Sequence, residues 1–353
     1  MIRLSFKTLS VGLATLACLL SAPAGADQIT IDMVTVGDPG NANDTGGSGI
    51  GAVAYTYQIG KYDVTIGQYA AFLNAVATTD THSLYNSSMG SDGNIKGIQQ
   101  NGSSGSYTYS VIGSGDRPIS YVSWFDAARF ANWMTNGQGS GSTETGAYTL
   151  GGATSGNAVA ANPGAAFRLP TENEWYKAAY YSPNYGGSGV AGYYAYATQS
   201  DTAPGNTIGS TANQANWYTG NGYSVTQSSS YSSSQNYLTD VGAFTNSGSF
   251  YGTFDQTGNV QQWNDLNGTA GSFLPVRGGT WGDDVPSDVD SSASSSFGPG
   301  IDSNYFGGFG FRLASPASSP SSVPEIDPNS LGSVLALVLG SLGLLERRRL
   351  KAA

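Results

Sequence analysis

The sequence has almost none of the residues that form disulfides or hold transition metals. Its 353 residues include one cysteine, Cys18, and one histidine, His82. Cys18 falls in the first apolar run, so the rest of the chain has no thiol, which excludes disulfides and thiolate metal centres there. One histidine cannot build a centre with several histidine ligands, and a lone histidine in a polar segment predicts an incidental surface residue.

Charged residues are scarce as well, and most of them are acidic. They make up 11% of the sequence, and the formal net charge is −10. Residues 27–322 hold 8 Lys+Arg and 21 Asp+Glu, a net charge of −13. Because an acidic surface repels phosphate backbones, we expect no nucleic-acid partner, whereas divalent cations remain compatible with it.

Glycine and aromatic residues are abundant. The chain contains 50 Gly and 22 Tyr, and aromatic residues make up 12% of it. Disordered chains are poor in aromatic residues, so this composition predicts a folded domain with a Trp/Tyr core and much of its length in loops.

The N-terminus has the pattern of a secretory signal peptide. Met1–Ser10 carries two basic residues, Leu9–Leu20 is apolar, and Ala24–Ala26 offers small residues at a cleavage point. We therefore expect residues 1–26 to be removed, with cleavage before Asp27.

The C-terminus has three parts that resemble a PEP-CTERM sorting signal. A Ser/Pro/Ala linker over Ser315–Ser322 precedes Val323–Glu325, the apolar run Leu331–Leu345 and the basic run Glu346–Arg349. The resemblance implies export in a Gram-negative-type bacterium and transient anchoring in the inner membrane through residues 331–345. The PEP-CTERM processing machinery would then transfer the protein to the outer surface or matrix. Ile326 departs from the usual Pro-Glu-Pro. The alternative is an ordinary C-terminal membrane anchor.

Three capping boxes predict helices. In each, a Thr or Ser N-cap is followed three positions later by a polar side chain that can bond back to it, and apolar residues recur at helical spacing. The pairs are Thr65 with Gln68, Ser123 with Asp126, and Thr171 with Glu174.

The segments between these helices predict strands and loops. Alternating or aromatic residues favour strands over Ile29–Val36, Tyr55–Tyr62 and Tyr193–Tyr196. The Gly/Ser-rich stretches Thr78–Gly115 and Gly139–Gly164 predict long surface loops.

Four motifs occur in a characteristic order. They are Phe-Arg-Leu-Pro-Thr-Glu-Asn-Glu-Trp at Phe167–Trp175, Gly-Asn-Val-Gln-Gln-Trp within Asp255–Trp263, Arg-Gly-Gly-Thr-Trp within Val276–Trp281, and Gly310–Arg312. Their order and spacing resemble the formylglycine-generating-enzyme, or sulfatase-modifying-factor, family of the C-type-lectin-like fold. The resemblance implies an α+β domain over residues 27–314, with a small twisted antiparallel sheet, short helices and extensive loops.

The resemblance also implies buried arginines. A charged guanidinium among apolar neighbours is costly unless it is paired, so we expect Arg168 to pair with Glu172 or Glu174. Arg277 and Arg312 are expected to be buried structural arginines, as in the family.

One loop resembles a calcium site of the family. The resemblance assigns the backbone carbonyls of Asp255, Gly258 and Val260 and the side chain of Gln262 as ligands. Gln262 stands where the family has Glu, so one negative charge is lost, which Asp255 or Asp265 could restore. The alternative is a tight turn held by hydrogen bonds without an ion.

The catalytic chemistry of the family is not expected. Formylglycine generation uses two active-site thiols that bind copper, and the stretch between Trp281 and Phe311 has no cysteine. A related branch holds iron with three histidines, which this chain lacks, so neither copper nor iron is expected.

Three functions remain open. The first is a non-catalytic surface or matrix protein that binds a glycan or exopolysaccharide, for which the Tyr/Ser/Asn-rich stretch Tyr180–Tyr237 is a candidate surface. A plain solvated loop is the alternative for that stretch. The second function is an enzyme with carboxylate-based chemistry, or an accessory factor to one. The third is a hypervariable lectin-like binder, diversified over Gly282–Phe309.

Overall fold

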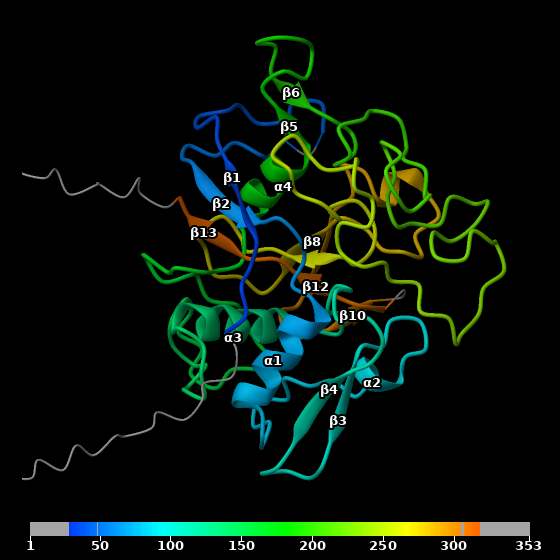
Figure 1. The fold of residues 1–353 in the computed structure, drawn as a ribbon. Helices are drawn as coiled ribbons and strands as arrows, with labels where there is room; N and C mark the ends of the chain where they lie inside the picture. The colour runs from blue at the N-terminus through cyan, green and yellow to red at the C-terminus, as the bar shows by residue number, and fades with distance from the viewer. Residues whose placement is uncertain (1–27, 48, 305–306, 318–353) are drawn as a thin grey trace, which may run out of the picture.

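The computed structural model describes residues 28–47, 49–304 and 307–317 (Figure 1). The predicted signal peptide at 1–26 and the predicted sorting segment at 323–353, including the apolar run 331–345, lie outside these residues. Among the described residues, no helix is both long and apolar enough to cross a membrane.

The described residues form short helices and many short strands. The helices are α1 (Ile66–Val76), α2 (Ser88–Ser91), α3 (Trp124–Thr135) and α4 (Glu172–Tyr180), with a 3-10 turn η1 (Pro286–Asp288). The strands are β1 (Met33–Val36), β2 (Tyr57–Gly60), β3 (Ile98–Asn101), β4 (Thr108–Val111), β5 (Tyr181–Ser182), β6 (Gly192–Tyr193), β7 (Gln262–Trp263), β8 (Leu274–Arg277), β9 (Ser295–Phe297), β10 (Ser303–Asn304), β11 (Gly307–Gly308), β12 (Gly310–Phe311) and β13 (Ala314–Pro316). This is the α+β class that the sequence predicts.

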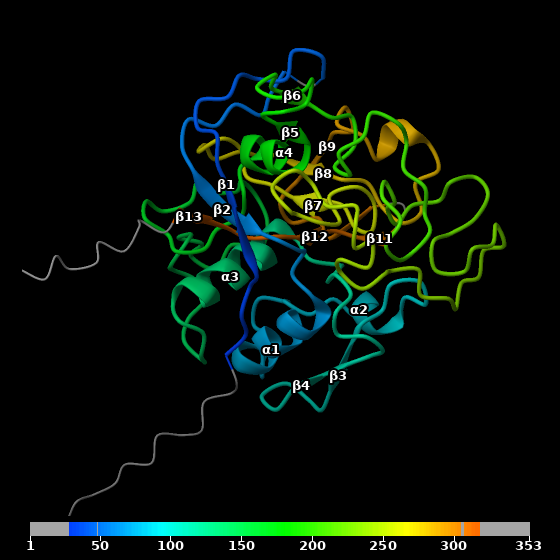
Figure 2. The same cartoon turned by 45° about the horizontal axis from the view of Figure 1, so that its top comes forward.

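The strands form two small central sheets rather than the one antiparallel sheet expected. β1 and β13 flank β2 in an antiparallel sheet, which brings both ends of the domain together. The second sheet has the order β12-β7-β8-β9, and its β12–β7 pair is parallel. The remaining pairs are the hairpins β3–β4, β5–β6 and β10–β11. In Figures 1 and 2, α1 and α3 lie together on one side of the central strands, and α4 lies on the other.

All three predicted helix starts are confirmed. Each N-cap hydroxyl accepts from the backbone N–H three residues later, and the side chain of that later residue accepts from the N-cap N–H. These boxes satisfy backbone donors that the first turn would otherwise leave unpaired. The strands at Ile29–Val36 and Tyr55–Tyr62 are also present, but shorter than expected. The strand expected over Tyr193–Tyr196 is mostly absent, because β6 covers Gly192–Tyr193 and shares one residue with it.

The prediction for Thr78–Gly115 was wrong. This segment forms α2 and the β3–β4 hairpin, and it buries Leu84, Met89, Ile98 and Tyr109. Turns separate these apolar residues, so they follow no helical or strand period. The segment therefore covers α1 as part of the core, instead of forming a surface loop.

Aromatic residues make up most of the core. Trp124, Trp175 and Trp263 are fully buried, and the Phe72, Phe130 and Phe311 rings meet edge to face near the helices. The predicted Trp/Tyr core is confirmed. Such large side chains hold together long segments that lack regular secondary structure.

The three arginines expected to be structural are all paired. Arg168 makes a bidentate bond to Glu174, with N–O distances of 2.5 and 2.6 Å, which decides between the two predicted acids. Glu172 instead pairs with Arg277 at 2.7 Å. Arg277 and Arg312 are buried as expected, and their ion pairs join segments of the domain core.

Candidate ligand-binding pocket

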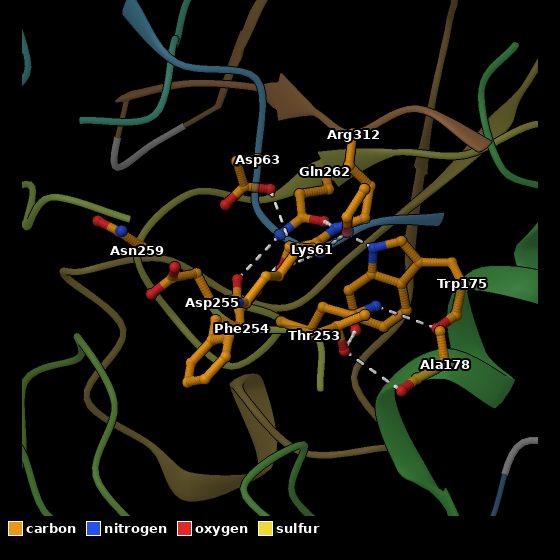
Figure 3. A network of polar contacts seen from close by, with 12 residues as sticks. Lys61, Asp63, Trp175, Ala178, Thr253, Phe254, Asp255, Asn259, Gln262 and Arg312 are labelled. Atoms are coloured by element: carbon orange, nitrogen blue, oxygen red, sulfur yellow. Dashed lines mark hydrogen bonds and ion pairs between the residues drawn. The ribbon is translucent and has the colours of Figure 1, made fainter. Parts of the chain in front are cut away.

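The predicted calcium loop is built around the Arg312 guanidinium (Figure 3). Arg312 is fully buried and donates to the carbonyl oxygens of Gly60 and Phe254, to Asp63 and to Gln262. These partners come from β2, from the connection between β2 and α1, from the loop before β7 and from β7 itself. The arginine thus fixes the loop from both sides.

The side chain of Gln262 is fully engaged with protein groups. Its Oε1 accepts from Trp175 Nε1 at 2.7 Å and from Arg312 Nε at 2.6 Å. Because both neighbours are obligate donors, the oxygen must face them, and Nε2 then donates to the Asp255 carbonyl oxygen at 2.9 Å. Two of the four predicted calcium ligands are therefore bonded to each other. Gln262 Oε1 already accepts two bonds, so this donor set does not fit a calcium ion that would take that oxygen as a ligand.

The carboxyl groups that were expected to restore the lost charge lie elsewhere. Asp255 Oδ2 accepts from Gly242 N at 2.7 Å, and burial raises the pKa of this carboxyl to about 6. Asp265 accepts from Trp124 Nε1, at the start of α3, at 2.7 Å and from Tyr148 Oη at 2.6 Å. Neither carboxyl replaces the charge of a glutamate at position 262.

Gly258 and Val260 form the turn of the same loop. Gly258 has a φ of +77°, and a Cβ there would lie 2.1 Å from the Asn216 carbonyl oxygen, so only glycine fits. Val260 is buried against Trp281 and Tyr237. The structure thus brings the four predicted residues into one loop, and calcium binding there stays a prediction against which this geometry weighs.

A pocket of about 640 Å³ opens on another part of the surface. Segments far apart in the sequence contribute to it: the α2–β3 connection, the residues before α3, the loop of residues 223–233, the turn after β8, and the β10–β11 hairpin. Its lining residues are Asp92, Asn94, Tyr121, Tyr223, Tyr231, Ser233, Trp281, Gly282, Ser303 and Gly307.

The aromatic lining is held by ring-to-ring contacts. Trp281 stacks on Tyr237 with centroids 4.7 Å apart and planes 8° apart, and Tyr237 stacks on Tyr231 at 6.0 Å and 15°. Tyr223 packs against Tyr237 at 4.5 Å and Trp281 at 5.8 Å. This aromatic column is pre-formed, so a ligand would not need to order it.

Asn94 fastens the loop of residues 223–237 to the segment after α2. Its Nδ2 donates to the carbonyl oxygens of Ser232 and Gln235, and its Oδ1 accepts from Tyr231 Oη at 2.6 Å. The Tyr237 N–H donates to the Asn94 carbonyl oxygen. In Figure 1 this yellow-green loop runs beside α2. One asparagine therefore positions the exposed half of the aromatic column.

Asp92 and Tyr121 form the polar floor of the pocket. Tyr121 Oη donates to Asp92 Oδ2 at 2.5 Å, and Asn94 N donates to Asp92 Oδ1 at 2.8 Å. Burial, together with the Asp92 carboxylate, raises the pKa of the Tyr121 phenol above its usual value. Tyr121 has a φ of +62°, a conformation that is strained for a residue of its size. Such strain is typical of ligand sites.

Trp281 contributes a donor that the fold leaves unused. Its side chain is 6% exposed, and its Nε1 has no hydrogen-bond partner among the described residues. Buried donors without partners are rare in folded proteins. Trp281 therefore supplies both an aromatic face and an unmet polar group to this part of the fold.

His82 does not line this pocket. Its Nε2 is 3.2 Å from Glu144 Oε1, and the same carboxylate pairs with the buried Arg129. Across the part of the chain that the structure describes, no group of three or more His, Cys, Asp or Glu side chains is placed to hold a metal ion.

The sequence did not identify the pocket, although two signals were present. The stretch Tyr180–Tyr237 supplies Tyr223, Tyr231 and Ser233, and its Tyr/Ser/Asn composition made it a candidate surface. Gly282–Phe309, the stretch that the hypervariable-binder hypothesis would diversify, supplies Gly282, Ser303 and Gly307. Asp92 and Asn94 come from a segment predicted to be a surface loop. No local pattern shows that they meet.

Comparisons with known proteins agree with this fold. The family described as "Sulfatase-modifying factor enzyme 1-like domain" matches residues 45–317. None of the curated proteins compared with the chain matches it. Among solved structures, CarF has a TM-score of 0.44 and 22% identity, covering 82% of this chain and 99% of its own.

Two further structures are similar. Treponema denticola variable protein 1 has a TM-score of 0.49 and 18% identity, covering 82% of this chain and 96% of its own. PvdO from Pseudomonas aeruginosa has a TM-score of 0.42 and 17% identity, with 80% and 94% covered. At these identities the likeness concerns the fold alone. The family match spans most of the chain, and the chain belongs to the sulfatase-modifying factor enzyme 1-like domain family.

Proposed function

We propose that the chain is an exported, non-catalytic binding protein whose aromatic pocket takes a glycan. The observation that carries this proposal is the lining itself: four aromatic side chains, Tyr121, Tyr223, Tyr231 and Trp281, stand beside polar groups of Asp92 and Asn94. A sugar ring has apolar C–H faces and a polar hydroxyl rim. Flat rings cover the faces, and carboxylate or amide groups bond the hydroxyls.

The size and rigidity of the pocket support the same proposal. A volume of about 640 Å³ lies within the range of small-molecule sites. The stacked rings lose little conformational freedom on binding, because their neighbours already hold them.

The scarcity of cysteine and histidine supports a binding role rather than catalysis. The copper-dependent oxidation implied by the family resemblance needs two thiols, and Cys18 is the chain's one cysteine. A bound glycan released unchanged is the expected result. Hydrolysis of the glycan by the purified protein would contradict this part of the proposal.

Export is the remaining part of the proposal. It rests on the signal-peptide pattern at 1–26 and on the three-part pattern over 315–353, which resembles a PEP-CTERM signal. A chain tagged within an exposed loop should fractionate with the outer surface or the matrix, and a chain ending at residue 322 should be released into the medium. Cytoplasmic retention of both would contradict it.

Glycan binding is tested with two matched variants. Tyr231 lines the pocket and is 57% exposed, whereas Phe273 lies outside it and is 65% exposed. After a glycan array has identified ligands, titration calorimetry should show at least a tenfold weaker affinity for Tyr231→Ala and no change for Phe273→Ala. No array signal, or equal affinities of the two variants, would overturn the assignment of the pocket.

A further inference from the structure

The charges around the pocket are of one sign. Asp92 is the one charged residue among the lining residues that the structure describes, and no Lys or Arg is among them. Lys96, the nearest lysine along the chain, does not line the pocket. Asp302 adds negative potential at Tyr121, and Asp284 does so at Tyr223. An anionic ligand would therefore meet repulsion and no cationic partner, so uronates, sulfates and phosphates are disfavoured.

The Asp92 carboxylate has room for further donors. Its two oxygens accept one bond each, from Tyr121 Oη and Asn94 N. An ionised carboxylate offers about four acceptor positions, so roughly half remain for a ligand. The two existing bonds fix its orientation, so a cationic donor would meet a carboxylate that is already in place.

The aromatic side chains favour the same charge. The face of a tyrosine or tryptophan ring is the negative end of its quadrupole and attracts cations. Tyr223, Tyr231 and Trp281 line the same pocket as Asp92. A ligand that carries both a sugar ring and a positive charge would satisfy the rings and the carboxylate together.

We propose that the pocket prefers saccharides that carry a free, protonated amino group over neutral and anionic saccharides. This inference rests on the proposed glycan-binding function and names its ligand class. The ammonium group bonds to Asp92 while the C–H face of the same sugar residue lies on the aromatic rings.

The test compares four probes by titration calorimetry on the full-length protein, held in mild detergent. The probes are a β-1,4-linked glucosamine tetramer, its fully N-acetylated counterpart, a galacturonic acid tetramer and spermidine. The glucosamine tetramer should bind at least tenfold more tightly than the N-acetylated tetramer, and the galacturonic acid tetramer should not bind. The preference should shrink in 1 M salt, because charge attraction is screened there.

Two variants test whether the Asp92 carboxylate causes the preference for the amino saccharide. Asp92→Asn should reduce the preference to less than threefold, and the ratio of the two affinities is the readout, because Asp92 also faces the hydroxyls of the N-acetylated tetramer. Asp240→Asn removes an exposed carboxylate outside the pocket and should keep the full preference. The salt dependence of the unaltered protein tests the same point without a variant.

The outcomes separate the inference from the function on which it rests. Equal affinities for the amino and N-acetylated tetramers would overturn the charge preference and leave glycan binding standing. Spermidine binding as tightly as the glucosamine tetramer would overturn the saccharide requirement. Binding of neither tetramer would overturn both.

Discussion

The Gln262 side chain donates through Nε2 to the backbone carbonyl oxygen of Asp255, across 2.9 Å. The family resemblance implies a glutamate that helps to hold calcium at the position of Gln262. Here an amide hydrogen occupies the direction from which a cation would approach the carbonyl. The Gln262 amide thus satisfies the loop from within, and it is fully buried.

Calcium should therefore have no effect on the unaltered protein, whereas Gln262→Glu should make the protein calcium-dependent. The carboxylate would place a second acceptor against the Asp255 carbonyl, which costs about 1–3 kcal/mol of unfolding free energy. Added calcium should recover that loss by bridging the two oxygens. Thermal unfolding with calcium and with chelator measures both effects. A melting temperature of the unaltered protein that falls with chelator would restore the original calcium prediction.

Asp255 should make the protein less stable as the pH rises from about 4 to about 6. Burial raises its pKa to about 6 in the folded state, whereas an unfolded aspartate has a pKa of about 3.9. In that window the unfolded chain has released the proton and the folded chain still holds it, so raising the pH favours unfolding.

The variant Asp255→Asn removes this titration and still accepts from Gly242 N. It should match the unaltered protein near pH 4 and exceed its unfolding free energy at pH 7 by up to about 3 kcal/mol. Urea titrations at the two pH values measure the difference. The exposed Asp240→Asn serves as the control, and an equal gain in both variants would refute the role of Asp255.

Local interactions explain which parts of the fold could be predicted. A capping box joins residues three positions apart, so Thr65, Ser123 and Thr171 identify the three helix starts without knowledge of the rest of the fold. Gln262 differs, because its orientation depends on Trp175 and Arg312, which are 87 and 50 positions away. The sequence gives the residue at that position but not the partners that turn its oxygen away from the loop.

The pocket could not be predicted for the same reason. Asn94 joins loops about 140 positions apart, through bonds to the backbone of Ser232 and Gln235. Neither segment has a helical or strand period, so neither carries a signal for where it packs. Composition alone indicated that the tyrosine-rich stretch contributes to a surface.

The buried ion pairs should contribute unequally to stability. Glu174 is fully buried and holds Arg168 through two bonds, while Glu172 is 17% exposed where it meets Arg277. Glu174→Gln removes a fully buried carboxylate that accepts from Arg168, Tyr55 and the Thr171 N–H, and should cost about 3–5 kcal/mol of unfolding free energy. Glu172→Gln is the matched control and should cost less, because the Glu172 carboxylate is itself partly exposed and Arg277 keeps its bonds to the carbonyl oxygens of Ser291 and Ala293. Equal losses in urea unfolding would show that burial does not set the difference.

Gly308 should be indispensable to the pocket. A methyl group added at Gly308 would lie 1.8 Å from the backbone nitrogen of Tyr121, and backbone cannot move aside as a flexible side chain can. Gly308→Ala should therefore push the β10–β11 hairpin away from Tyr121, lower the unfolding free energy by about 3 kcal/mol and weaken glycan binding. Gly141→Ala is the control, since a methyl group there meets nothing within 4 Å. Melting temperatures and calorimetric affinities of the two variants measure these effects. If Gly308→Ala retained both, the strained approach of Tyr121 to the hairpin would not be what shapes the pocket.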